Sequence, residues 1–396
     1  MSGMNFLERL LDGGAVEWKP LGEVAKIQRG RRLVKSELEE VGKYAVFQNC
    51  MTPLGYYHES NAKSDTTFII SAGAAGEIGY SDVDFWAADD VYYFLTPENL
   101  KSKFLYYFLL TQQTKILGQV RRASVPRLSK TAFEKIPLPI PCPDNPDRSL
   151  AIQAEIVRIL DTFTALTAEL TAEISDRKKQ YNYYRDRLLT FGDEVPVMQL
   201  SQCCVSIADG DHQAPPQTNI GIPFITISNV SNSYQIDFTN TKFVSEAYYS
   251  ELDDKRKARK NDILYTVVGS FGIPVFIDDN RKFTFQRHIA ILRPNGNVIL
   301  PKYLYHVLRS SDFLKQAYAV AVGAAQKTIT LTALNRMKVP VPSLEEQARI
   351  IAILDKFDTL THSISEGLPR EIALRQKQYE YYRDLLLSFP PPLTLP

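Results

Sequence analysis

The chain has 396 residues, 44% of them hydrophobic, which is enough for two domains that each bury a core. A formal net charge of +1 gives no overall basic character, and no apolar run approaches the roughly 18 residues of a membrane span. The N-terminal residues lack the apolar core of a signal peptide and the four cysteines form no CxxC pair, so we expect a reduced, cytoplasmic protein.

The first part of the chain predicts a mostly β domain. Residues 15–24 indicate a short strand and a turn, and β-rich runs with turn signals follow at 44–50, 66–80 and 84–95. The period then changes, and LKSKFLYYFLLTQQTKIL at 100–117 predicts an amphipathic helix packed on a sheet. The prolines of KIPLPIPCPDNPDRS (135–149) exclude both a helix and a central strand, so this segment ends the domain.

A long helix is predicted from the end of this proline-rich segment to Phe191, with Asp147 or Ser149 as its N-cap. About 40 residues give it a length of about 60 Å. Its seam residues recur at spacings that alternate between three and four, with one extra four near Leu170. They are Ile152, Ile156, Ile159, Phe163, Leu166, Leu170, Ile174, Arg177, Tyr181, Tyr184 and Leu188. This heptad-like pattern indicates packing against another helix.

The simplest partner is a copy of the helix near the C-terminus. ILDTFTALT at 159–167 returns as ILDKFDTLT at 353–361, an offset of 194 residues. RKKQYNYYRDRLLTF, from Arg177, returns as RQKQYEYYRDLLLSF, from Arg375, an offset of 198 residues. The second copy therefore carries four more residues between the blocks, about one helical turn. TAELTAEI occupies that place in the first copy.

The segments before the helices are also repeated. KIPLPIP (from Lys135) matches KVPVPS (from Lys338), and KFLYYFLL (from Lys103) matches KYLYHVLR (from Lys302). The glycines of SAGAAGEIGY align with those of TVVGSFGIPV. Between these marks the halves differ, because QRGRRLVKSELEE and ADGDHQAPPQTNI share no pattern. A duplicated frame with diverged inserts is what a reader of two different targets needs.

No catalytic motif accompanies the repeat. The chain lacks GxGxxG at a strand–helix turn, a P-loop, HExxH, GxSxG and the (N/D)PP(Y/F) tetrapeptide of amino-methyltransferases. Asp211-His212 has no second ligand at a telling spacing, so a polar turn is favoured over a metal or acid–base site. The loops at Gly73 and Gly269 fit a phosphate cradle and a tight strand turn equally well.

Basic residues gather at Gln28–Lys35, Arg121–Arg127, Lys255–Lys260 and Arg281–Arg287. Such patches fit phosphate contacts and equally fit solvated surface. Loop side chains whose donors and acceptors match base edges are the candidate readers of DNA. In the first half they are Arg29, Arg31, Arg32, Gln48, Asn49, Arg121 and Arg122. In the second half they are His212, Gln213, Ser228, Asn229, Ser270, Gln286, Arg287, His288, Gln326 and Lys327.

The duplicated ILDxFxxLT and RxKQYxYYRDxLL helices, preceded by KIPLP or KVPVPxxxxQ, resemble the specificity (S) subunits of type I restriction–modification enzymes. The likeness covers the whole chain. TAEL repeats, CPDNPDRSLAIQ and EGLPREI narrow the resemblance to the type IC group. GIPFITISNV, DILYTVVGSFGIPV and FQRHIAILRP look like blocks of target recognition domains.

The resemblance implies an α+β fold with a pseudo-twofold internal repeat. Two globular α/β target recognition domains are separated by two long helices that form an antiparallel coiled coil. The expected segments are an N-terminal segment 1–14, recognition domain 1 at 15–149, a central spacer helix 150–192, recognition domain 2 at 193–344, a C-terminal spacer helix 345–390 and a tail 391–396.

The resemblance also implies a DNA-binding function without catalysis. Each recognition domain would read one half of a split double-stranded target, and the coil would dock two methyltransferase (M) subunits, which carry two restriction (R) subunits. The chain would hold no cofactor, since S-adenosylmethionine, ATP and Mg²⁺ belong to those partners. The docking candidates are Lys178, Lys179, Tyr181, Tyr184, Tyr379 and Tyr382. The shorter first spacer predicts a shorter separation of the half-sites.

Two alternative functions remain at this point. A self-contained DNA methyltransferase or nuclease with recognition domains lacks its cofactor motif, and S-adenosylmethionine binding by the isolated chain would reveal it. A coiled-coil adaptor without a nucleic-acid role is the other alternative. Salt-dependent, sequence-selective binding of duplex DNA would exclude an adaptor of this kind.

Overall fold

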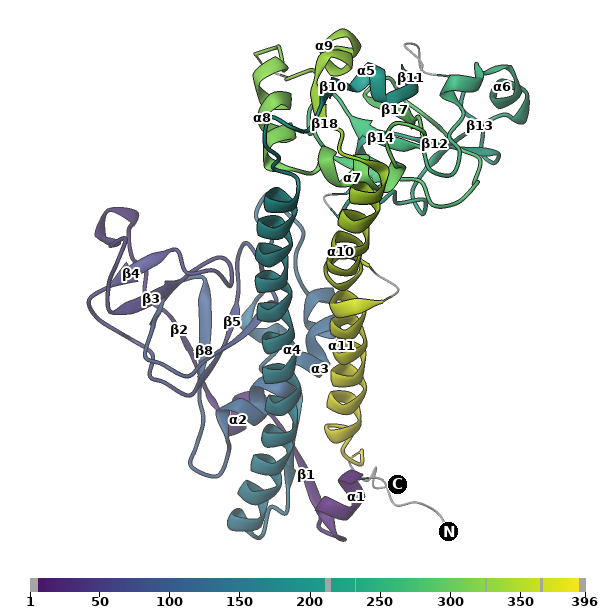
Figure 1. The fold of residues 1–396 in the computed structure, drawn as a ribbon. Coiled ribbons are helices and arrows are strands. Elements are labelled where there is room, and N and C mark those ends of the chain that lie inside the picture. The colour runs from purple at the N-terminus through teal and green to yellow at the C-terminus, as the bar shows by residue number, and fades with distance from the viewer. Residues whose placement is uncertain (1–5, 211–214, 232, 325, 364–365, 392–396) are drawn as a thin grey trace, which may run out of the picture. The chain divides into compact units, whose positions relative to one another are not determined.

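The computed structural model describes residues 6–210, 215–231, 233–324, 326–363 and 366–391 (Figure 1). The chain divides into two compact units. Unit 1 contains residues 1–169 and 374–396, and unit 2 contains residues 170–373. Each unit therefore combines one recognition segment with part of each spacer segment. Within the described residues, no helix has the length and apolar character needed to cross a bilayer.

Unit 1 is built around a four-stranded antiparallel sheet of order β2-β8-β5-β6, with a three-stranded sheet β4-β3-β7 and a pair β1-β9. Its elements are α1 (Phe6–Leu11), β1 (Val16–Pro20), α2 (Leu21–Val24), β2 (Lys26–Arg29), η1 (Lys35–Glu37), β3 (Tyr44–Phe47), β4 (Gly55–Tyr57), β5 (Thr66–Ile70), β6 (Ile78–Ser81), β7 (Trp86–Ala87), β8 (Val91–Leu95), α3 (Ser102–Gly118), η2 (Lys130–Ala132), β9 (Pro137–Pro141) and the first part of α4 (Pro146–Leu188). The last part of α11 (Gly367–Leu386) completes it.

Unit 2 repeats this plan with a four-stranded sheet β11-β17-β14-β15, a three-stranded sheet β13-β12-β16 and a pair β10-β18. Its elements are β10 (Val197–Gln199), α5 (Leu200–Cys203), β11 (Cys204–Asp209), β12 (Ile222–Ile225), η3 (Ile227–Asn229), β13 (Lys242–Val244), α6 (Glu246–Glu251), η4 (Asp254–Arg256), β14 (Ile263–Thr266), β15 (Pro274–Phe276), β16 (Thr284–Phe285), β17 (Ile289–Pro294), α7 (Pro301–Leu308), α8 (Ser311–Val320), α9 (Leu331–Arg336), β18 (Lys338–Pro340) and α10 (Leu344–His362). The predicted internal repeat is confirmed.

The two units share details as well as strand order. Each three-stranded sheet contains one parallel pair, β3–β7 in unit 1 and β12–β16 in unit 2. The proline-rich strands β9 and β18 each pair with one partner in a two-stranded sheet, which accommodates residues that cannot donate to a ladder. The units differ where the single helix α3 corresponds to two helices, α7 and α8. Ser310 caps α8 by accepting from Phe313 N at 3.2 Å.

The predicted helix at 100–117 is confirmed as α3, whose apolar face fills the core of unit 1. Phe104, Leu105 and Phe108 are buried there together with Ile152 and Ile156 of α4. The helix α3 also packs on strands β5 and β6. This layer of sheet, α3 and α4 joins the recognition segment of unit 1 to its spacer helix.

The long helix α4 begins at Pro146, and its cap differs from the prediction. Asn145 Oδ1 accepts a hydrogen bond from Arg148 N at 3.0 Å, so Asn145 is the N-cap and neither Asp147 nor Ser149 has that role. Proline is favoured at the first helical position because it needs no amide hydrogen there. The prediction failed because it placed the helix start after this proline.

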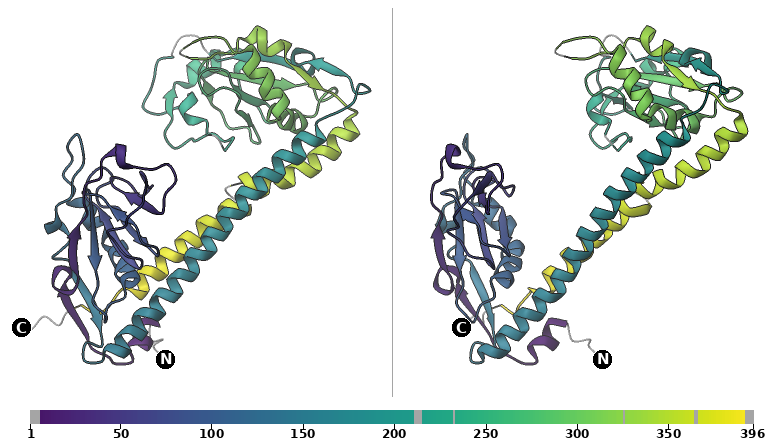
Figure 2. Two further views of the ribbon diagram at one scale, coloured as in Figure 1. Left: turned by 90° about the vertical axis from the view of Figure 1, so that its left-hand side faces the viewer. Right: turned by 60° about the vertical axis from the view of Figure 1, so that its left-hand side comes forward.

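The predicted seam of α4 is seen in its exposure. Between residues 159 and 177, its members are partly buried, whereas most of the intervening residues are exposed. Within unit 1, Phe163 stacks on Tyr382 of α11 with centroids 5.3 Å apart. Within unit 2, Tyr184 stacks on Phe357 of α10 at 5.6 Å. The same aromatic pair is thus formed twice with the roles of the helices exchanged, and in each unit α4 lies beside the returning helix (Figure 2).

The C-terminal spacer is not the single helix that its sequence predicted. Helix α10 ends at His362 and α11 begins at Gly367, so the second copy consists of two helices. Nine helical residues separate the repeated blocks in α4, namely 168–176, and nine do so in the second copy, namely 362 and 367–374. The four additional residues therefore do not lengthen the helix by a turn.

Gly367 permits α11 to begin close to the end of α10. Its φ is +73°, and a Cβ at this position would lie 2.5 Å from Thr359 O and 2.8 Å from Leu360 O. Both the left-handed backbone and the close approach exclude a larger residue without rearrangement.

We expect Gly367→Ala to lower the free energy of unfolding of unit 2 by about 1–3 kcal/mol, because it adds backbone strain and a steric clash. Chemical denaturation followed by circular dichroism measures this change. Gly118→Ala is the matched control, since a methyl group added to Gly118 in α3 would meet no atom within 4 Å. Equal stability of the two variants would contradict the proposed requirement for glycine.

Candidate nucleic-acid interface

In unit 1, four chain segments meet at one edge of the four-stranded sheet, which we call loop edge 1. β2 ends there, β8 begins there and the β5–β6 hairpin turns there. Residues 119–129 join it, since Gly73 N donates to Pro126 O at 3.2 Å, and Asn49 O accepts from Ala74 N at 2.8 Å. All candidate readers of the first half lie on these segments, directly after β2, or in the loop after β3 that bonds to them: Arg29, Arg31, Arg32, Gln48, Asn49, Arg121 and Arg122.

The arginines of loop edge 1 are exposed. Arg29 Nε donates to Asp89 O at 2.7 Å, which fixes the direction of that side chain. Over the described part of the chain, Arg31, Arg32, Arg121 and Arg122 make no ion pair with a carboxylate. Guanidinium groups in this state can donate to phosphate oxygens and to O6 and N7 of guanine.

In unit 2, the equivalent edge, loop edge 2, is formed by the end of β11, the β14–β15 hairpin, the start of β17 and residues 322–324 and 326–329. Val267 N donates to His288 O at 2.9 Å, and Gly269 N donates to Lys327 O at 3.0 Å. Loop edge 2 gathers Ser270, Gln286, Arg287, His288, Gln326 and Lys327. His212 and Gln213 follow β11 but lie outside the described residues.

The glycines at the two hairpins are turn residues. Gly73 and Gly269 have φ values of +79° and +71°. Their amides already donate to backbone carbonyls of the neighbouring segment, as described above. Of the two interpretations that the sequence left open, the structure favours the tight turn, because these amides are not free to cradle a phosphate.

A cavity of about 530 Å³ opens at loop edge 2. Its lining includes Arg287, His288 and Gln326 together with Asp209. Burial, and then the charge of Arg287, lower the pKa of His288, so its imidazole is neutral at pH 7 and offers one donor and one acceptor. The cavity therefore presents a hydrogen-bonding pattern that differs from the arginine-rich loop edge 1.

The turn after β12 lies beside this edge, since Gln286 N donates to Ile225 O at 3.0 Å. Ser228 is exposed on the turn, but Asn229 is only 5% exposed. The amide of Asn229 accepts from Thr226 N at 3.0 Å and donates to two carbonyls at 3.2 Å. Asn229 thus has a structural role in place of the predicted base contact, because its donors and acceptor are used within the turn.

The basic run at 255–260 is bound to neighbouring acidic groups. Lys255 pairs with Asp253 at 3.2 Å and Arg259 pairs with Asp254 at 2.5 Å. Lys257 Nζ donates to a backbone carbonyl at 2.9 Å. Of the two roles that the sequence left open, phosphate contact and solvated surface, these contacts favour solvated surface. The run contributes little unpaired positive charge for phosphate.

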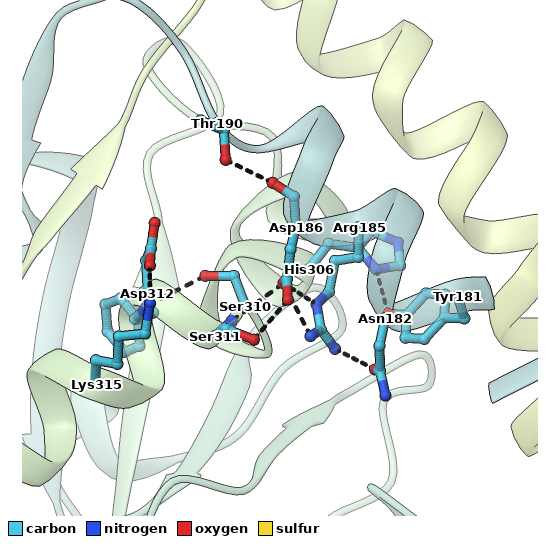
Figure 3. Close-up of polar contacts among 11 residues, drawn as sticks. Tyr181, Asn182, Arg185, Asp186, Thr190, His306, Ser310, Ser311, Asp312 and Lys315 are labelled. Atoms are coloured by element: carbon cyan, nitrogen blue, oxygen red, sulfur yellow. Dashed lines mark hydrogen bonds and ion pairs between the residues drawn. The ribbon is translucent and has the colours of Figure 1, made fainter. Parts of the chain in front are cut away.

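The tyrosine-rich end of α4 is fixed within unit 2 (Figure 3). Tyr181 is 1% exposed, and its hydroxyl lies 3.1 Å from His306 Nδ1. Asp186 accepts from Ser311 N at 3.1 Å and from Ser311 Oγ at 2.5 Å, and it receives Arg185 Nε at 2.9 Å. Burial would raise the pKa of Asp186, but these hydrogen bonds lower it overall. Tyr181 is therefore a packing residue. The predicted docking role is wrong for this tyrosine, because its ring is buried and a partner cannot reach it.

The other docking candidates differ in exposure. Tyr184 and Tyr382 are 42% and 38% exposed beside their stacking partners, and Tyr379 packs near Tyr107 in unit 1 with centroids 6.4 Å apart. The seam criterion missed two more exposed tyrosines, Tyr183 and Tyr381, at 58% and 64%. The sequence contained a signal for their exposure: both lie in the repeated QYxYYRD motif at a position that does not belong to the seam.

The lysines of α4 that precede this motif are accessible to a partner. Lys178 and Lys179 are both exposed. Lys179 Nζ lies 2.9 Å from Asp176 one turn earlier, an exposed pair that water screens strongly. These side chains can therefore contact another protein without any change in the packing of unit 2.

Two buried glutamines connect the recognition segments to the spacer helices, and they were not among the predicted site residues. Gln153 Oε1 accepts from Lys101 N at 2.9 Å, and Gln347 Oε1 accepts from Leu300 N at 2.7 Å. Both are 0% exposed. The repeat shows that the two are equivalent, because each is the glutamine that follows a proline-rich strand: KIPLPIP precedes Gln153, and KVPVP precedes Gln347.

The family model for the type I restriction modification DNA specificity domain matches residues 15–177 and 211–374. The specificity subunit of type I restriction enzyme EcoR124I/EcoR124II from Escherichia coli is 38% identical, and the alignment covers 100% of both chains. The specificity subunit of type I restriction enzyme EcoprrI, also from Escherichia coli, is 30% identical over 92% of this chain and 93% of the relative.

Solved structures show the same fold. The S subunit of a type I restriction–modification system from M. genitalium has a TM-score of 0.58 at 18% identity, covering 96% of this chain and 97% of that one. A chain from a structural study of complex assembly and conformational transition of the type I R-M system has a TM-score of 0.59 at 17% identity, covering 94% and 97%. The repeated fold, the family model and the full-length relatives agree: the chain belongs to the DNA specificity subunits of type I restriction–modification enzymes.

Proposed function

We propose that loop edges 1 and 2 each read one half of a bipartite DNA target. The observation that carries this proposal is that one sheet edge occurs twice with the same backbone frame and different side chains. Most hydrogen bonds to DNA go to phosphates and fix the register, while side chains in the grooves select bases. Two unlike edges on one frame therefore suit two unlike half-sites.

The side chains of the two edges favour different base contacts. Arginine pairs bidentately with guanine, whereas glutamine pairs with adenine. Loop edge 1 offers Arg31, Arg32, Arg121 and Arg122, and loop edge 2 offers Gln286 and Gln326 beside Arg287 and a neutral His288. Phosphate contacts from the same arginines would add an affinity that falls with salt.

The spacer helices have the second part of the proposed function, which is to dock partner subunits. We place the methyltransferase subunits, two per chain, on the exposed faces of α4 and α11, and the restriction subunits on the methyltransferases. Catalysis, with S-adenosylmethionine, ATP and Mg²⁺, would belong to those partners in the cytoplasm. The absence of catalytic motifs in the sequence supports this division, and the TAEL repeats and the EGLPREI motif support the type IC group.

Replacing Gln286, Arg287 and His288 by Ala is expected to weaken recognition of one half-site, by about 1–3 kcal/mol for each lost base contact. Binding of the complex to duplexes altered in either half-site measures this. Lys282→Ala is the control, because Lys282 precedes β16, whereas Gln286 follows it, and because Lys282 Nζ lies 3.8 Å from the carboxylate of Glu246. An equal loss at both half-sites would indicate a general phosphate or folding role.

Insertion of one further TAEL after Leu170 is expected to increase the separation of the half-sites. Four helical residues add about 6 Å, equivalent to at most about two base pairs at roughly 3.4 Å each. Methylome sequencing of a host with all three subunits measures the separation. An insertion of AAEL should increase the separation of the half-sites by the same amount, because the separation is expected to depend on the length of the helix and not on its sequence. An unchanged separation in both variants would refute the role of the spacer as a ruler.

Charge reversal at Lys178 and Lys179, with Tyr183→Ala and Tyr381→Ala, is expected to weaken binding of the M subunits at least tenfold. Co-purification and titration of the M subunit measure this binding. Lys255→Glu, outside the spacer, should leave it unchanged. Retained binding by the spacer variants would remove this face of the helices as the docking surface.

A further inference from the structure

Arg309 occupies a buried position at the junction of α7 and α8 in unit 2. It is 6% exposed, and its Nη1 atom lies 2.5 Å from Asp358 Oδ1 of α10 and 3.0 Å from the Tyr305 hydroxyl. Three tyrosine rings surround the guanidinium carbon, which is 4.8 Å from the centroid of Tyr181, 5.0 Å from Tyr305 and 3.9 Å from Tyr234. Arg309 therefore connects both spacer segments of unit 2 with the loop that carries Tyr234.

That loop belongs to the recognition segment and not to the repeated frame. It follows Ser228 and Asn229 at loop edge 2, and Val230 forms an isolated bridge with Ile236. Ser231 N donates to Gln235 O at 3.0 Å. The bonds of Asn229 to the carbonyls of Asp237 and Asn240 close the turn further. These bonds connect the backbone around Tyr234 with the turn that carries Ser228.

The backbone of Tyr234 supports a specific role for its ring. Its φ is +63°, in the left-handed region that a tyrosine adopts only at an energetic cost. The close approach of its ring to the Arg309 guanidinium is a cation–π contact that offsets this cost. A glycine would satisfy the backbone but would lack the contact.

The loop borders both a cavity and a buried hydrophobic cluster. A cavity of about 470 Å³ lies beside it, lined by residues of the loop, of the β15 region, of α7 and of α10. Its lining includes Tyr234, Phe238, Lys302 and Asp358. The loop also packs through Val230, Ile236 and Phe238 on a buried cluster of the recognition segment, and the Tyr234 ring adds the contact with Arg309.

Unit 1 has no equivalent charge. In the repeat, Arg309 corresponds to Leu110 and Asp358 corresponds to Thr164. The ion pair is therefore unnecessary for folding a recognition segment onto the spacer helices. Its presence in unit 2 accompanies the diverged insert that contains Tyr234.

We propose that Arg309 is a positioning residue for recognition of the second half-site, because it holds Tyr234 and thereby the Ser228 turn at loop edge 2. This proposal rests on the proposed function of that edge. It assigns selectivity to a residue that does not itself reach the DNA. It also predicts that the first half-site is insensitive to the contact.

The test uses the complete complex and sequencing of methylated sites in a host genome. Tyr234→Gly removes the ring and keeps the φ value accessible, while Tyr234→Phe keeps the ring and is the conservative control. The double variant Arg309→Leu with Asp358→Thr installs the residues of unit 1 and leaves no buried charge unpaired. Thermal unfolding of each purified chain is measured in parallel.

We expect Tyr234→Gly and the double variant to methylate sites altered in the second half-site at least tenfold more often than the wild type. Selectivity at the first half-site should be unchanged, and Tyr234→Phe should match the wild type. Unchanged selectivity at the second half-site, or equal relaxation at both, would overturn the positioning role. A wild-type complex without bipartite selectivity would instead refute the proposed function itself.

Discussion

One buried glutamine in each unit bonds the recognition segment to its spacer helix, beside the hydrophobic packing of α3 and of α7 on that helix. Gln153 and Gln347 bond the backbone that precedes α3 and α7, and their amide nitrogens donate to Asn99 O and Val298 O at 3.1 Å. A buried amide that lost these partners would cost about 1–3 kcal/mol. Each glutamine therefore allows little variation in how a sheet is placed on its helix, so that the diverged loops are presented from a constant frame.

The frame is constant, but the second contact between α3 or α7 and the spacer is not. In unit 1, Tyr107 donates to Asp161 at 2.6 Å; in unit 2, His306 Nε2 lies 2.7 Å from Asp355. Burial lowers the pKa of His306, so the imidazole is neutral at pH 7 and joins Asp355 to the Tyr181 hydroxyl. Different side chains thus satisfy equivalent carboxylates, because the frame requires a hydrogen-bond donor and not a particular residue.

Much of this architecture could be predicted from the chain, because repetition reveals shared structure without a second sequence. The seam, the helix α3 and the equivalence of the two halves followed from spacing alone. The break between α10 and α11 was missed because the matched blocks lie on both sides of it, although Gly367 and Pro369 both indicate a helix boundary. The roles of Asn229 and Tyr181 depended on burial, which local pattern does not determine for a polar residue inside a loop or at a helix end.

The break between α10 and α11 also bears on how the spacer changes length. Four residues rotate an α-helix by about 400°, so an added unit turns the following side chains about 40° away from the seam. A continuous helix must absorb that rotation by supercoiling or by losing contacts. The second copy is not one continuous helix, because α10 ends at His362 and α11 begins at Gly367. A change of length in α4 would therefore face a second copy that is already divided into two helices, which meet closely at Gly367.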